Sequence, residues 1–174
     1  MTIKKIKIFN IFFLFFLSFI YHNIYKYFPF DIIAIFFPVN ESIWEHMKII
    51  YFTLLTSSIL EYFIYKRYNL NINNFNISMM VKSTAGVIIY LCLFIPIYKV
   101  FGKVFILSIL LMLLIYILME YISYKILKSD DVNIKVLPLI IIVLNIILFL
   151  ILTFYPLHNF LFFDYLKFGY GILK

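Results

Sequence analysis

Several windows of about 20 residues in this chain contain almost no charged side chain. An α-helix needs about this length to cross the hydrocarbon core of a bilayer. Hydrophobic residues make up 66% of the chain and charged residues only 13%, so a water-soluble domain of this size could not cover its apolar surface. The sequence therefore predicts an all-α, polytopic membrane helix bundle that forms a single integral membrane domain over residues 1–174.

The apolar windows predict about five transmembrane helices, separated by short polar or proline-containing connections. The expected spans are residues 8–25, 42–65, 83–98, 104–124 and 136–155. Two other segments, residues 28–39 and 157–174, are too short or too polar to span the membrane. We expect both segments to be interfacial or re-entrant, and the C-terminal one to be an amphipathic strip on the membrane surface.

The distribution of lysine and arginine predicts the orientation of these spans. With a cytoplasmic N-terminus, the inner side receives nine basic residues: Lys4, Lys5, Lys7, Lys66, Arg67, Lys82, Lys125, Lys128 and Lys135. The outer side receives six: Lys26, Lys48, Lys99, Lys103, Lys167 and Lys174. We therefore expect a multi-pass protein of the plasma membrane with an external C-terminus. The net charge of +7 is scattered over both faces, which suits anionic lipid and gives no sign of nucleic-acid binding.

The polar run at residues 38–48, PVNESIWEHMK, stands at the head of the second apolar window. Ser42 to Glu45 fits a helix-capping box, with Ser42 or Asn40 as the N-cap and Glu45 at the third helical position. Glu41 would also be favoured by the positive end of the helix dipole. Capping explains these residues without a ligand, but it does not explain His46.

The predicted topology brings all three histidines of the chain to the outer face, together with four of its eight carboxylates, Asp31, Glu41, Glu45 and Asp164. This combination is typical of a metal or acid–base site. We expect His22, His46 and His158 to bind a divalent metal such as zinc, with Glu45 as the general base. Glu41 and Asp164 complete the expected catalytic group.

A polar stripe follows one face of the second predicted helix through His46, Thr53, Ser57 and Glu61. Such a stripe should face the bundle interior and not lipid. Glu61 also begins a Glu-Tyr-x-x-Tyr-Lys pattern that returns at Glu120, which hints at two related helical hairpins. At both positions we expect the glutamate to lie near the cytoplasmic end of its helix, where the neighbouring Tyr and Lys residues anchor the helix at the membrane interface.

Two segments carry a family resemblance. Residues 38–48, and the tail at residues 156–164 that closes with Gly169-Tyr170-Gly171, resemble the signature of small bacterial multi-pass membrane proteins of unknown function. The resemblance implies a multi-pass protein of the bacterial inner membrane and supplies no activity.

Three functional hypotheses follow. The leading one is a divalent-metal-dependent membrane hydrolase that acts on a lipid or envelope substrate. The second is a small-solute or ion transporter or binding subunit that uses the stripe from His46 to Glu61 as its path. The third is a non-catalytic membrane subunit whose polar face docks a protein partner. The sequence leaves enzymatic activity, substrate, metal, partner and oligomeric state open.

Overall fold

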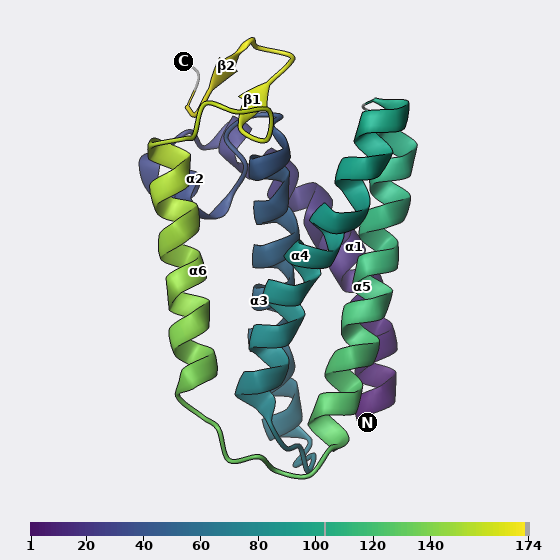
Figure 1. The fold of residues 1–174 in the computed structure, drawn as a ribbon. Helices are drawn as coiled ribbons and strands as arrows, with labels where there is room; N and C mark the ends of the chain where they lie inside the picture. The colour runs from purple at the N-terminus through teal and green to yellow at the C-terminus, as the bar shows by residue number, and fades with distance from the viewer. Residues whose placement is uncertain (103, 173–174) are drawn as a thin grey trace.

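Long helices run alongside one another in this protein, and a small hairpin closes one end of the bundle (Figure 1). The computed structural model describes residues 1–102 and 104–172. Within them the helices are α1 (Ile3–Tyr27), α2 (Asp31–Phe36), α3 (Ile43–Arg67), α4 (Phe75–Phe101), α5 (Phe105–Lys128) and α6 (Leu137–Phe154). Strand β1 (Phe163–Asp164) pairs antiparallel with β2 (Gly169–Tyr170). The predicted all-α helix bundle is confirmed.

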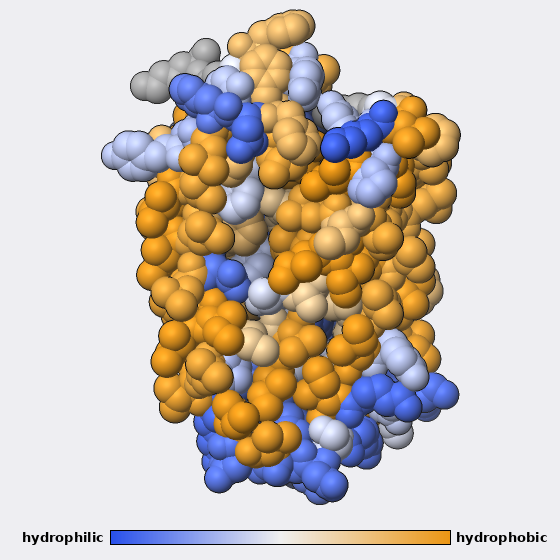
Figure 2. Space-filling model, in the orientation of Figure 1, coloured by the Kyte–Doolittle hydropathy of each residue, from blue (hydrophilic) through white to orange (hydrophobic). Residues whose placement is uncertain are grey.

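The helices have the length and composition of membrane spans. Helices α3, α4, α5 and α6 are each long and apolar enough to cross a bilayer. On the face seen in Figure 2 the side wall is mainly apolar, and most hydrophilic residues gather at the two ends, with a small group at mid-height. The protein is therefore a multi-pass membrane protein in contact with lipid. Helix α1 is also 25 residues long, and its assignment as a further span stays a prediction.

Helix α3 is the central helix of the bundle. In its most apolar window 67% of the residues are buried, against 17%, 28% and 22% for α4, α5 and α6. Helix α1 packs against α3 and α5, while α4 packs against α3, α5 and α6. The prediction that the polar stripe of α3 faces inward is confirmed for Thr53 and Ser57, which are fully buried, and for Glu61, which is 3% exposed. His46, the first residue of the stripe, is partly exposed.

The two ends of the bundle differ. One end holds α2, the start of α3 and the C-terminal strands, and we call it the hairpin end (Figure 1). The other holds the N-terminus and the α3–α4 and α5–α6 connections, and we call it the N-terminal end. Residues 28–39 contain the short helix α2 between Pro29 and Pro38. The described part of the C-terminal tail forms turns and the β1–β2 pair, which lie across the hairpin end.

Candidate functional site

The start of α3 is fixed by a capping interaction. Ser42 is the N-cap, and its hydroxyl accepts a hydrogen bond from the Glu45 N–H at 3.3 Å. This half of the predicted capping box is confirmed. In a capping box the Glu45 carboxylate would accept the N–H of the N-cap residue. Here it reaches further back along the chain and accepts the N–H of Val39 at 2.9 Å. The turn that precedes α3 is therefore anchored at both ends, and Glu41 lies within it.

The C-terminal tail holds the same turn from the other side. Buried Asp164 accepts the Glu41 N–H at 3.0 Å through Oδ2, and the Asn40 side chain donates to the Gly171 carbonyl at 2.8 Å. The Trp44 N–H donates to the Leu161 carbonyl at 2.8 Å, which satisfies one of the free amides at the helix start. The segments at residues 38–48 and 156–171 thus form one unit at the hairpin end, although they lie far apart in the sequence.

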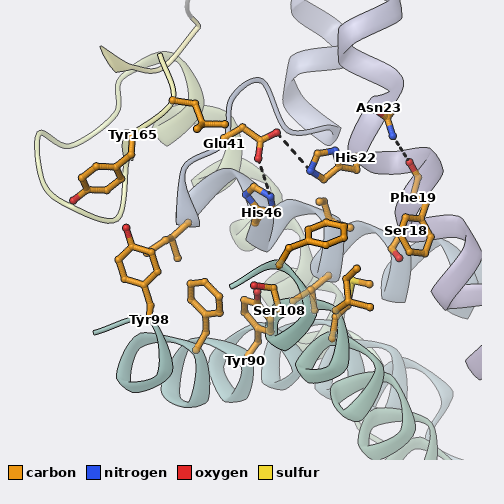
Figure 3. A pocket seen from close by; sticks show the side chains of 18 of the residues that line it. Ser18, Phe19, His22, Asn23, Glu41, His46, Tyr90, Tyr98, Ser108 and Tyr165 are labelled. Carbon is orange, nitrogen blue, oxygen red and sulfur yellow. Dashed lines mark hydrogen bonds and ion pairs between the residues drawn. The ribbon is translucent and has the colours of Figure 1, made fainter. Parts of the chain in front are cut away.

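Three side chains meet at this unit, and we call them the His–Glu–His group: His22 from α1, Glu41 from the turn and His46 from α3 (Figure 3). The two rings pack edge to face with centroids 5.2 Å apart, and the Glu41 carboxylate contacts both of them. Its Oε1 is 3.6 Å from His22 Nε2, and its Oε2 is 3.5 Å from His46 Nε2. Each residue offers one potential metal-binding atom, and these atoms lie within 4.8 Å of one another. All three side chains are partly exposed, between 25% and 37%.

The ring orientation of His46 is set by its own helix. His46 Nδ1 lies 2.9 Å from the Ser42 carbonyl oxygen, which can only accept, so Nδ1 carries a proton. In a neutral ring Nε2 is then unprotonated, and its lone pair faces the Glu41 carboxylate. Both groups are hydrogen-bond acceptors, so they repel each other. A cation between the two atoms relieves this repulsion, either as a proton on Nε2 or as a metal ion. A metal-binding histidine is commonly oriented in this way, by a hydrogen bond from its other nitrogen.

A cavity of about 460 Å³ adjoins the His–Glu–His group. Its walls come from α1, α3, α4, α5 and the tail, with Tyr90, Phe94 and Tyr98 on α4 and Phe105, Ser108 and Met112 on α5. In the close view Tyr90, Tyr98 and Ser108 lie across the cavity from the group (Figure 3). This volume is in the range of about 300–1,000 Å³ that is usual for small-molecule sites. The carboxylate and the two imidazoles lie together in a mainly apolar space, whose other polar lining groups include the hydroxyls of Tyr90 and Tyr98.

Glu45, the predicted general base, has a different setting from Glu41. It is 2% exposed and forms an ion pair with Lys48 at 2.7 Å. Lys48, which was expected to lie at the outer surface, is fully buried and also donates to the Ala34 carbonyl at 2.8 Å. Thr153 of α6 donates to the other Glu45 oxygen at 3.5 Å. These contacts join α2, α3 and α6, and Glu45 does not line the cavity.

His158 and Asp164, two other predicted site residues, also lie outside the His–Glu–His group. His158 is exposed and stacks on Tyr170 of β2, with ring centroids 4.6 Å apart. Besides the Glu41 N–H, Asp164 accepts the N–H groups of Leu166 and Lys167 at 2.7 and 3.2 Å, which shapes the turn between the strands. Asp164 therefore touches the site through the backbone of Glu41.

A buried ionic network near the N-terminal end was not predicted, and the expectation that Glu61 and Glu120 are interfacial anchors is wrong. They are 3% and 1% exposed, respectively. Lys7 of α1 contacts Glu61 at 2.6 Å and Glu120 at 3.1 Å, while Lys82 of α4 lies 2.5 Å from Glu120 and 3.4 Å from Glu61. Two lysines thus balance two glutamates, and the charges come from four helices.

The repeat in the sequence was the signal for this network. The glutamates that begin the two Glu-Tyr-x-x-Tyr-Lys patterns meet at Asn10, whose amide donates to Glu61 at 2.8 Å and to Glu120 at 2.6 Å. Lys7 stands three residues before Asn10, so both fall on one face of α1. By contrast, the Thr53 and Ser57 hydroxyls donate to carbonyls of α3 itself, at 2.6 and 3.0 Å. Those bonds are typical of inward-facing polar residues in a membrane helix and do not by themselves make a path.

Comparison with known proteins identifies a family and no activity. A family model described as "Family of unknown function (DUF6512)" matches residues 1–172. The chain matches no curated protein and no solved structure.

Proposed function

Because the chain belongs to the DUF6512 family of unknown function, its activity has to be argued from its site, and we propose that it is a divalent-metal-dependent membrane hydrolase. The observation that carries this proposal is the His–Glu–His group at the mouth of the cavity. Two histidines and one carboxylate are the ligand set of several catalytic zinc sites, which keep a further position open for water or substrate. The same set with open positions also binds non-haem iron, so the metal class is a divalent transition metal such as zinc.

The geometry of the group fits such an ion. Metal–ligand bonds of about 2.0–2.1 Å in a tetrahedron place neighbouring ligand atoms about 3.3–3.4 Å apart. The two nitrogen-to-oxygen distances of 3.6 and 3.5 Å are close to this spacing, but they involve different Glu41 oxygens. With one atom from each residue the set lies within 4.8 Å, so the side chains would have to move closer together to bind one ion. The Ser42 carbonyl already fixes His46 with Nε2 toward Glu41. We infer that His22, Glu41 and His46 are the ligands.

A metal ion held there would supply Lewis acidity for the hydrolysis of an ester. In that reaction the oxygen of water joins the acyl or phosphoryl group, and a proton of the water leaves with the alcohol. Glu41 has two oxygens, one toward each histidine, so one can bind the metal while the other accepts the proton. The buried Glu45–Lys48 pair and the Asp164 bonds support a positioning role for those two carboxylates.

We further infer that the hairpin end faces the outside of the plasma membrane. The bias of lysine and arginine toward the N-terminal side supports this orientation. The site would then be open to substrates and metal ions of the envelope.

Metal analysis of the purified protein tests the proposal. The wild-type protein, purified without an affinity metal and exposed to equimolar zinc, should retain about one ion per chain by elemental mass spectrometry. His22→Ala, Glu41→Gln and His46→Ala should each lose the ion while keeping the thermal unfolding profile of the apo protein. His158→Ala is the matched control and should retain the ion. Equal zinc retention by wild type and all four variants, or none by the wild type, would overturn the proposal.

A further inference from the structure

We propose that the cavity takes a single-chain amphiphile from the bilayer, with its polar headgroup at the His–Glu–His group and its hydrocarbon chain between α1, α4 and α5. This inference rests on the proposed function, since it names the substrate class of that site. The sequence leaves open whether the substrate is a lipid or another component of the envelope, and this inference selects the lipid.

The distribution of polarity in the cavity argues for an amphiphile. Glu41, His22 and His46 are the charged or titratable groups at one end. Away from them the walls are mostly aromatic or aliphatic, with Phe94, Ile50 and Met112 among the lining residues, and the polar groups on α4 and α5 are the hydroxyls of Tyr90, Tyr98 and Ser108. A glycan or a peptide strand presents many hydroxyl or amide groups, and each one buried without a partner is costly. A hydrocarbon chain needs no such partners.

The depth of the cavity argues for a chain-like ligand. On α5 the lining extends from Phe105 to Met112, and on α4 from Tyr98 to Tyr90. At 1.5 Å per residue, these stretches correspond to about 10–12 Å along the helices. Cavity-lining side chains therefore continue for about two turns along α4 and α5.

The exposure of the rim argues for entry from the membrane. Phe19 of α1 and Phe105 of α5 line the cavity and are 40% and 70% exposed, respectively. Nearer the N-terminal end the same two helices are held together, because Lys7 and Asn10 of α1 bond to Ser123 and Glu120 of α5. Helices α1 and α5 are thus joined at one end and separated by the cavity at the other. A lipid that enters through such an opening moves its hydrocarbon chain from the apolar bilayer into an apolar cavity. The contacts of its headgroup therefore determine whether it remains bound.

Photochemical labelling in lipid nanodiscs tests the proposal. The probe is a lysophospholipid with a diazirine and an alkyne tag on its single acyl chain, and labelled residues are mapped by mass spectrometry. In the wild-type protein we expect labelling at the cavity floor, on Tyr90, Phe94 or Met112. Unlabelled lysophospholipid should compete, whereas the free headgroup and a soluble disaccharide of the cell wall should not. Labels found only on the outer surfaces of the bundle would overturn the proposal.

A pair of tryptophan variants supplies the matched control. Ser108→Trp fills the cavity from α5, while Leu110→Trp adds the same bulk to an exposed, lipid-facing position of that helix. Ser108→Trp should reduce floor labelling about tenfold, equivalent to about 1.4 kcal/mol of binding free energy, and Leu110→Trp should leave it unchanged. Equal labelling of both variants would contradict the proposal. If Ser108→Trp does not fold, Ser108→Phe and the wild-type map still decide.

A repeat of the labelling with metal-stripped protein separates this inference from the proposed function. If floor labelling persists in the protein without bound zinc, the amphiphile site is supported and its binding does not depend on the metal. Stoichiometric zinc with no floor labelling keeps the metal site and rejects the amphiphile.

Discussion

Asp164 Oδ2 accepts the backbone N–H of Glu41 at 3.0 Å, so the C-terminal hairpin directly holds the residue whose carboxylate contacts both His22 and His46. The bond joins residues that are 123 positions apart in the chain. Because Asp164 is fully buried and bonds three N–H groups, the turn before α3 and the turn between β1 and β2 depend on one carboxylate. The site is thus assembled from α1, α3 and the tail together.

Asp164→Asn should loosen the site without removing a ligand. The substituted NH₂ group cannot accept a hydrogen bond, so at least one of the three N–H groups loses its partner, at a cost of about 1–3 kcal/mol. We expect weaker zinc binding in calorimetric titration and a lower unfolding temperature. Asp131→Asn changes an exposed carboxylate that caps a local turn at Asn133 and should leave zinc affinity unchanged. Unaltered zinc affinity in Asp164→Asn would show that the tail does not position Glu41.

Glu45→Gln should reduce the stability of the protein, whereas Glu41→Gln should reduce metal binding. Glu45→Gln leaves Lys48 as a buried charge without its carboxylate, which costs about 3–5 kcal/mol, so we expect reduced abundance and an early thermal transition. Glu41→Gln changes a partly exposed side chain and should fold normally but lose the metal. Replacing Glu45 and Lys48 together, by Gln and Met, should be less damaging than the sum of the single changes. A stable Glu45→Gln protein with no activity would instead support Glu45 as the general base.

Charge removal from the ionic network should destabilise the bundle. Glu120→Gln leaves Lys7 and Lys82 facing a single carboxylate, and we expect a loss of about 3–5 kcal/mol, measured as a fall in the thermal unfolding midpoint in detergent. Lys82→Met combined with Glu120→Leu keeps the charge balanced and should recover part of this loss. Lys128→Met removes an exposed lysine from the same end of α5 and serves as the control. Normal stability of Glu120→Gln would mean that the network contributes little to the fold.

Topology reporters test which side of the membrane carries the site. An enzyme that is active only outside the cytoplasm should be active when it is fused after Lys174 and silent when it is fused after Ser129, which ends α5 at the N-terminal end. Lysine and arginine bias is the physical reason for this orientation. The reverse pattern would place the His–Glu–His group on the cytoplasmic side.

The elements that the sequence predicted correctly depend on local or periodic signals. Apolar windows predicted the four helices α3 to α6 that are long and apolar enough to span a membrane, and the spacing of Thr53, Ser57 and Glu61 predicted that one face of α3 turns inward. Ser42 was recognisable as an N-cap because its partner, the Glu45 N–H, is only three residues away. In each case the interaction is local in the chain or is repeated along one helix.

What only the tertiary structure decided is the pairing of polar groups between helices. Lys7 meets Glu61 across 54 residues, and which acidic residue it meets depends on the rotation and packing of α1 and α3. The same packing places Glu41, and not His158, with His22 and His46, while Glu45 turns away to Lys48. Composition determined that these groups could not face lipid, because a charge in hydrocarbon is costly. It could not determine their partners, because several lysines and glutamates can satisfy one another and only helix packing selects among them.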